Sequence, residues 1–239
     1  MSYLLVTDLD NTLVGDNASL QQFNQLTREL RNRGVLKLAY ATGRSLESFG
    51  ELKKSQPFLD MPDALISSVG TEIYLNGTQR VPNWPHISNW DVIGLQSLLA
   101  HIPALKIQPP TGQRQFKLGY FLEENPEILQ MVKAALAEHP VEVVYGPDIY
   151  LDILPKGAHK GGSATFLSGV LGIDAKNIIA CGDSGNDISM LEMHKGIVVG
   201  NAQTELLNWL DTAKSTTTYV AKNHYASGVI EGLRHYGVI

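Results

Sequence analysis

Short apolar runs alternate with amphipathic segments along the first part of the chain. The runs predict strands over residues 3–8, 35–41 and 63–75, the last interrupted at Gly70 and then resumed. Between these strands, the spacing of apolar positions predicts one helix over residues 19–34, which ends at Gly34, and a second helix over residues 45–55. Continuous apolar strands that alternate with helices are typical of a parallel sheet covered on both faces.

The same alternation returns near the end of the chain, where apolar runs predict strands over residues 177–182, 196–202 and 217–221. Both ends of the chain therefore look like halves of one sheet. Between these halves the pattern changes at "VPNWPHISNW" and changes back at "ILPKGAHKGG". The segment between these two stretches is predicted to contain two helices, a strand and a hairpin. We expect this α+β insert, residues 82–155, to form its own domain, and residues 1–81 with 156–239 to form the core domain.

Composition narrows the class of protein. Nineteen basic and twenty-four acidic residues give a formal charge of −5, and no block of like charges stands out, so we expect neither nucleic acid nor an anionic membrane as a partner. Cys181 is the only cysteine, which excludes a disulfide framework and a cysteine-based metal site. The sequence has no basic leader and no apolar run of roughly 20 residues, so we expect a cytoplasmic protein.

Two aspartates follow the first apolar run in the stretch "YLLVTDLDNTLVGD". Asp10 with Asn11 is a common turn or helix cap, and for either aspartate alone this interpretation is favoured over catalysis. A calcium loop is excluded because Leu13 occupies the place of the expected glycine and Ser19 that of the glutamate. A catalytic role for Asp8 and Asp10 requires partners from distant segments.

Such partners occur where the other predicted strands end. The carboxyl ends of parallel strands form the edge of an open α/β sheet at which ligands bind. Reading each strand end gives carboxylates and a hydroxyl with neighbouring amides, contributed by Asp8, Asp10, Thr42, Gly43, Arg44, Asp183, Asn186 and Asp187. The start of the helix that follows the insert adds the ammonium group of Lys160. This mixture suits phosphoryl transfer, which requires a hard cation such as Mg²⁺, a lysine and hydrogen-bond donors around a charged phosphoryl group. Aspartate can also act as the nucleophile and form an aspartyl-phosphate.

The motifs "DLDNT", "ATGR", "KGG" and "GDSGND", taken together and in this order, resemble those of phosphatases of the haloacid dehalogenase superfamily. The resemblance implies a Rossmann-like core with a parallel sheet and an inserted α+β (C2-type) cap. The stretches "SVGTEIY", "ILPKGAHKG" and "GNAQTELLNW" narrow the resemblance to the sucrose-phosphate phosphatase family, in a short form without a C-terminal extension. That family implies Mg²⁺-dependent hydrolysis of sucrose 6-phosphate to sucrose and inorganic phosphate, with a sucrose-phosphate synthase as a potential partner.

The resemblance also implies a role for each residue that matches a motif. Asp8 would be the nucleophile and a metal ligand, and Asp183 would be a second carboxylate ligand. Asp10 would protonate the leaving oxygen, later activate water, and bind the metal through its backbone carbonyl. The phosphoryl oxygens would be held by Thr42, by the amides of Gly43 and Arg44, and by Lys160. Asn186 and Asp187 would complete the surroundings of the metal and the lysine.

Sugar specificity is expected from the insert and from "GTEIY". Candidate sugar-binding residues are Glu72 in the core and, in the insert, Lys117, Asp148 and Asp152. For the three residues of the insert, the alternative is an ordinary solvated position on a strand face, which is favoured for the two aspartates.

Rival interpretations differ in reaction or in class. Within the same fold, a broader sugar phosphatase or a phosphomannomutase-like phosphotransferase would use the same core residues. A receiver-type signalling domain also uses an acidic cluster, but its acidic pair is normally adjacent, which disagrees with the spacing of Asp8 and Asp10. A sugar-binding module with a degenerate core is disfavoured because every expected catalytic position is filled.

Overall fold

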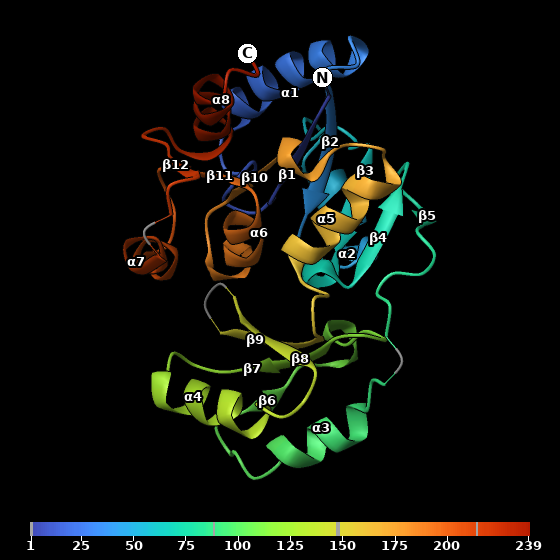
Figure 1. Cartoon of the computed structure of the whole chain (residues 1–239), viewed down its shortest axis with the longest axis vertical. Helices are drawn as coiled ribbons and strands as arrows, with labels where there is room; N and C mark the ends of the chain where they lie inside the picture. The colour runs from blue at the N-terminus through green and yellow to red at the C-terminus, as the bar shows by residue number, and fades with distance from the viewer. Residues whose placement is uncertain (1, 88, 147–148, 214) are drawn as a thin grey trace.

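A large sheet organises most of the chain. The structure, a computed structural model, describes residues 2–87, 89–146, 149–213 and 215–239. Eight strands pair in the order β12-β11-β10-β1-β2-β3-β4-β5, and those from β12 through β3 are parallel (Figure 1). Their bounds are β1 Tyr3–Thr7, β2 Leu36–Ala41, β3 Ala64–Ser67, β4 Glu72–Leu75, β5 Gln79–Arg80, β10 Ile178–Gly182, β11 Lys195–Val198 and β12 Thr218–Val220.

Helices cover both faces of this sheet, as the alternating pattern predicts. Apolar residues of α1, α2 and α8 pack on one face, and those of α5, α6 and α7 pack on the other. The bounds are α1 Asn17–Asn32, α2 Leu46–Ser55, α5 Lys160–Val170, α6 Ile188–Met193, α7 Thr204–Ala213 and α8 Tyr225–His235. Short 3₁₀ segments occur at η1 Ser68–Gly70, η3 Ala175–Asn177 and η4 Gly185–Asp187. The prediction of a parallel sheet between two helical layers is confirmed.

The third predicted strand does not resume in the same direction. Ser68, Val69 and Gly70 all have positive φ angles, of 51°, 63° and 110°, so the chain reverses there and β4 pairs antiparallel with β3. Gly70 also lies against the backbone of His159, whose carbonyl carbon would be 2.3 Å from a Cβ at Gly70. A glycine is required at this position by both its backbone conformation and its clearance.

The insert contains a separate antiparallel sheet in the order β6-β7-β9-β8. Its strands are β6 Lys106–Ile107, β7 Leu118–Phe121, β8 Val141–Tyr145 and β9 Tyr150–Pro155, and its helices are α3 Val92–Leu99, η2 Pro110–Gly112 and α4 Pro126–Ala135. Alternate residues of β7 and β9, such as Leu118 and Ile153, pack under α3 and α4 on the outer face. The other face of this sheet is turned toward the large sheet (Figure 1). The expected α+β insert is confirmed.

Within the part of the chain that the structure describes, none of the helices combines the length and the apolar character needed to cross a membrane.

Candidate active site

A pocket of about 1080 Å³ lies between the carboxyl edge of the large sheet and the inner face of the insert. This position is where an open α/β sheet binds ligands. Both parts of the chain line the pocket, and among its lining residues are Asp8, Asp10, Arg44, Glu72, Lys117, Asp152, Asp183 and Asn186. Its volume is at the upper end of the usual range for small-molecule sites, so a disaccharide phosphate would fit.

Lys160 is the centre of the polar network at the bottom of the pocket. It is the first residue of α5, and its side chain is fully buried. Its Nζ donates to Asp8 Oδ1 at 2.7 Å, to Asp187 Oδ1 at 2.7 Å and to Asn186 Oδ1 at 2.8 Å. An ammonium group has three protons, so these three acceptors use its full hydrogen-bonding capacity. The sequence-predicted residues Asp8, Lys160, Asn186 and Asp187 are therefore in direct contact.

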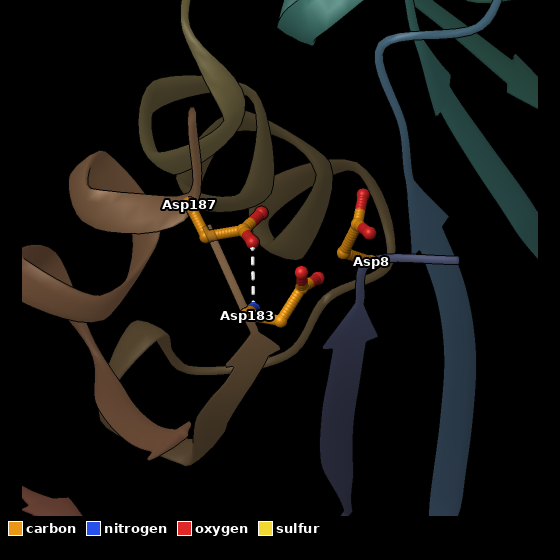
Figure 2. Close-up of side chains that lie close together, drawn as sticks. All are labelled: Asp8, Asp183 and Asp187. Atoms are coloured by element: carbon orange, nitrogen blue, oxygen red, sulfur yellow. Dashed lines mark hydrogen bonds between the residues drawn. The ribbon is translucent and has the colours of Figure 1, made fainter. Parts of the chain in front are cut away.

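Asp183 lies beside Asp8, at the end of the neighbouring strand β10. Figure 2 shows the carboxylates of Asp8, Asp183 and Asp187 gathered together, and one oxygen of each lies within 4.8 Å of the others. Thr12 Oγ1 donates to Asp183 Oδ1 at 2.7 Å. Asp187 Oδ2 accepts from the amides of Asp183 at 2.9 Å and Ser184 at 3.1 Å. Asp187 is thus held by the backbone and by Lys160, whereas Asp8 and Asp183 have fewer donors.

The charge of this cluster makes it suitable for a divalent cation. Three carboxylates and one ammonium group leave two negative charges in a buried site. Burial, reinforced by the charges of Asp187 and Asp183, raises the pKa of Asp8 despite the opposing effect of Lys160. Burial and Asp187 raise the pKa of Asp183 to about 7. Asp8 and Asp183 therefore have too little positive charge around them to stay ionised easily. A hard cation that prefers oxygen ligands would supply this charge.

The Lys160 ammonium remains charged in this environment. Burial alone would lower the pKa of Lys160, but the carboxylates of Asp187 and Asp8 outweigh that effect and raise it. A buried ammonium group that stays protonated can offset the charge of a bound anion without first taking up a proton.

The side chain of Arg44 makes a contact in addition to the role expected for its backbone amide. Its guanidinium forms a bidentate ion pair with Asp10, with Nε 2.8 Å from Oδ2 and Nη2 2.7 Å from Oδ1. Its backbone amide donates to Thr42 Oγ1 at 3.1 Å. The expected phosphate donors Thr42, Gly43 and Arg44 follow β2 and lie near Asp8, but Arg44 also fixes the side chain of Asp10. This ion pair is not expected from the sequence.

Three of the four candidate sugar-binding residues line the pocket. Glu72 Oε2 accepts from Ser67 Oγ at 3.3 Å and Tyr74 OH at 3.2 Å. Lys117 forms an ion pair with Asp152, and both side chains are only 7% exposed. Burial raises the pKa of Asp152, although Lys117 and a hydrogen bond from Gln108 counteract this. The alternative of solvated strand positions is therefore wrong for Lys117 and Asp152. Asp148 lies outside the described residues.

Two further residues of the site were missed by sequence reasoning. Thr12, which contacts Asp183, is the last residue of the motif "DLDNT", and this place in the motif was the available signal. His159 precedes Lys160, and its Nδ1 accepts from the Gly162 amide at 3.1 Å, so it caps α5. The cap fixes the start of the helix that carries Lys160.

The fold and the site together define a class: a haloacid dehalogenase-type α/β core with an inserted α+β cap, as the motif resemblance implied. A haloacid dehalogenase-like hydrolase from Bacillus subtilis shares the fold, with a TM-score of 0.71 at 20% identity over 99% of this chain and 92% of that one. We call the insert the cap from here on.

The chain belongs to the sucrose-6F-phosphate phosphohydrolase family, whose model matches residues 1–237. It is 36% identical to probable sucrose-phosphatase 2 of Arabidopsis thaliana over 98% of this chain and 59% of that protein. The chain thus spans about three fifths of that relative. It is 33% identical to mannosylfructose-phosphate phosphatase of Agrobacterium fabrum, covering 98% of this chain and 97% of that protein. The sucrose-phosphatase of Synechocystis, solved with sucrose and phosphate, has a TM-score of 0.92 at 35% identity and 99% coverage of both chains.

Proposed function

We propose that this protein hydrolyses sucrose 6-phosphate to sucrose and inorganic phosphate through an aspartyl-phosphate intermediate. The observation that carries the proposal is the hydrogen bond of Lys160 to Asp8, with a carboxylate oxygen of Asp183 within 4.8 Å of one of Asp8, in a pocket that the cap closes on one side. The family of the chain, and the likeness to a sucrose-phosphatase solved with sucrose and phosphate, support the choice of substrate.

Asp8 is the proposed nucleophile. Lys160 holds Asp8 Oδ1, so we expect the other oxygen, Oδ2, to attack phosphorus as the ester P–O bond breaks. The leaving sugar oxygen takes its proton from Asp10. Asp10 then accepts a proton from water, whose oxygen attacks the phosphorus of the aspartyl-phosphate and releases phosphate while Asp8 is restored. Because Arg44 holds both carboxylate oxygens of Asp10, the side chain of Asp10 must partly leave this ion pair when it transfers a proton.

The remaining core residues bind and orient. Lys160 offsets the negative charge of the phosphoryl group, and Thr42 and the Gly43 amide donate hydrogen bonds to its oxygens. The Arg44 amide would do the same after leaving its hydrogen bond with Thr42 Oγ1. Asn186 and Asp187 hold Lys160 in place, and Asp187 is the less suited to bind a metal because its own oxygens already accept from Lys160 and two amides.

We propose Mg²⁺ as the cofactor. It would be held by Asp8, Asp183 and the backbone carbonyl of Asp10. Asp187 would hold Lys160 and the backbone amides of Asp183 and Ser184 in place beside it. When bound, Mg²⁺ supplies positive charge that draws the substrate's phosphoryl oxygens into the acidic cluster and stabilises charge in the transition state. The unbalanced negative charge of the cluster supports this assignment.

The cap is proposed to select the sugar. Residues 82–155 would act as the specificity domain over a core of residues 1–81 and 156–239. Glu72, Lys117 and Asp152 face the pocket, and Asp148 stays a prediction of the sequence. A sugar hydroxyl that hydrogen-bonds to Lys117 or Asp152 would add to their existing ion pair, so a smaller ligand without that hydroxyl would bind less tightly.

A second candidate substrate is mannosylfructose phosphate. The Agrobacterium relative named for it has nearly the same length as this chain and a similar identity. Sucrose and mannosylfructose share the fructose unit, so the two candidates differ only in the second sugar. A broader sugar phosphatase and a phosphomannomutase-like phosphotransferase stay as wider alternatives. If sucrose 6-phosphate is the substrate, a sucrose-phosphate synthase is the enzyme that would supply it.

The test is phosphate release from a panel of esters, with Mg²⁺ or with EDTA. We expect sucrose 6-phosphate to be hydrolysed fastest, EDTA to stop the reaction, and Asp8→Asn to be inactive while remaining folded. The panel includes mannosylfructose phosphate, trehalose 6-phosphate, glucose 6-phosphate and mannose 6-phosphate. Equal rates for all esters would refute the specific substrate, and activity that survives EDTA would refute the metal. A requirement for a bisphosphate activator would indicate a mutase.

A further inference from the structure

The cap touches the catalytic loop at two glycines. A Cβ placed on Gly185, in η4 of the core, would lie 2.8 Å from the carbonyl oxygen of Tyr145 at the end of β8 in the cap. A Cβ placed on Gly146 would lie 3.3 Å from Asn186 Nδ2 and 3.5 Å from Asn186 Cβ. The two segments therefore approach each other so closely that a side chain at either position would crowd the other.

Clearance, and not backbone conformation, explains the glycine at both positions. Neither Gly146 nor Gly185 has a positive φ angle, so other residues could adopt the same backbone. On the core side, the amide of Gly185 donates to Glu205 Oε1 at 3.2 Å, in the first turn of α7. The turn at Gly185 is thus held by the core from one side and covered by the cap from the other.

Asn186 connects this contact to the catalytic lysine. Its amide oxygen accepts from Lys160 Nζ at 2.8 Å, whereas its amide nitrogen is the atom nearest to a Cβ placed on Gly146. The oxygen also lies 3.4 Å from Ser184 Oγ, which can donate to it. The side chain of Asn186 is thus confined between the backbone of the cap and the ammonium group that contacts Asp8. A displacement of the cap at Gly146 would change the space available to Asn186, and with it one of the three acceptors of Lys160.

We propose that Gly146 is a positioning residue of the cap, which keeps the Asn186 amide against Lys160 and so links the placement of the cap to the placement of the catalytic lysine. The proposal rests on the role that we propose for Lys160. It explains why a backbone segment of the specificity domain lies on the loop that carries Asn186 and Asp187, a contact that sugar binding by the cap does not itself require.

The test is a double-mutant cycle between Gly146 and Asn186. Gly146→Val adds bulk against Asn186, and Asn186→Ala removes the side chain through which Gly146 would act. The readouts are kcat and KM with p-nitrophenyl phosphate, and the affinity for inorganic phosphate by calorimetry, which can be measured even in an inactive variant. Gly50→Ala in α2 is the matched control, because a Cβ there has nothing within 4 Å.

We expect Gly146→Val to lower kcat about tenfold, which corresponds to about 1.4 kcal/mol in the barrier, and to weaken phosphate binding. Gly50→Ala should leave both unchanged. In the Asn186→Ala background, Gly146→Val should change neither quantity by more than about twofold. Equal losses from Gly146→Val in the two backgrounds would overturn the proposal, because the glycine would then act on cap packing alone. Thermal unfolding of each variant establishes that it is folded.

These outcomes are separable from the proposed substrate. p-Nitrophenyl phosphate and inorganic phosphate contain no sugar, so the cycle remains informative if sucrose 6-phosphate is not hydrolysed by the wild-type protein. Conversely, wild-type activity on sucrose 6-phosphate with additive losses in the cycle would refute only the role of Gly146.

Discussion

We expect the stability of the metal-free protein to fall as the pH rises, because the carboxyl group of Asp183 is buried. Its pKa is raised from an ordinary 3.8 to about 7, chiefly by burial and by the charge of Asp187. Because the folded-state pKa lies above the unfolded one, the stabilisation from protonated Asp183 is complete below about pH 4 and is lost as the pH rises through about 7. One pKa unit corresponds to about 1.4 kcal/mol, so the whole shift corresponds to about 4 kcal/mol.

Asp183→Asn tests this reasoning. The Asn side chain at position 183 stays uncharged at every pH, and its amide oxygen can still accept from Thr12 Oγ1. The free energy of unfolding is measured in urea with EDTA at pH 5 and pH 8. From the two pKa values, the wild-type protein should lose up to about 3 kcal/mol relative to the variant over this interval.

Thr12→Val is the companion variant. The Thr12 hydroxyl lowers the pKa of Asp183 in the wild-type protein. Removal of this hydroxyl should therefore raise that pKa further and leave Asp183 ionisable. The pH dependence of the variant should extend to higher pH. Unfolding free energies of the wild-type protein and Asp183→Asn that stay parallel from pH 5 to pH 8 would refute the argument. Addition of excess MgCl₂ at pH 8 should restore more stability to the wild-type protein than to Asp183→Asn, because ligand binding to the folded state alone stabilises it.

Two predictions concern structural charges outside the acidic cluster. Lys117→Met leaves the carboxylate of Asp152 buried without its ion-pair partner, and we expect urea unfolding at pH 7 to show a loss of about 3 to 5 kcal/mol. The double variant with Asp152→Asn should recover most of it, and no recovery would contradict the reasoning. Glu231 is different: partial burial raises its pKa, but hydrogen bonds from the Lys222 amide, Tyr219 hydroxyl and Asn223 lower it to about 2. Glu231→Gln should therefore destabilise the protein above about pH 4.5, and the difference should shrink as the pH falls toward 2, whereas a pH-independent difference would rule out this origin.

Much of the fold and of the candidate site was predictable from local sequence. Apolar runs of strand length alternate with helical spacing, and such a pattern can bury its apolar surface only in a parallel sheet between helices. Polar residues at the ends of those runs must then share one edge of the sheet. The pattern therefore places Asp8, Thr42 and Asp183 together, and Lys160, at the start of the helix that follows the insert, completes a set drawn from four widely separated segments of the chain.

Contacts between side chains from distant segments were not predictable in this way. The direction of β4 depends on three consecutive positive φ angles after Ser67, and the apolar pattern alone does not reveal them. The ion pair of Lys117 with Asp152 depends on the pairing of β7 with β9, which sets Asp152 opposite Gly119, two residues after Lys117, and both charged side chains are buried there. The same residues in an unpaired strand would be solvated.

By itself, the sequence determined which chemical groups meet at the edge of the sheet, because strand ends and motif spacing are local properties. Only the tertiary structure decided how these groups are paired: Arg44 with Asp10, Thr12 with Asp183, and Gly146 against Asn186. Such pairings depend on the distances between segments far apart in the chain, to within a few tenths of an ångström. Those distances are determined by the packing of the whole molecule, which no local pattern records.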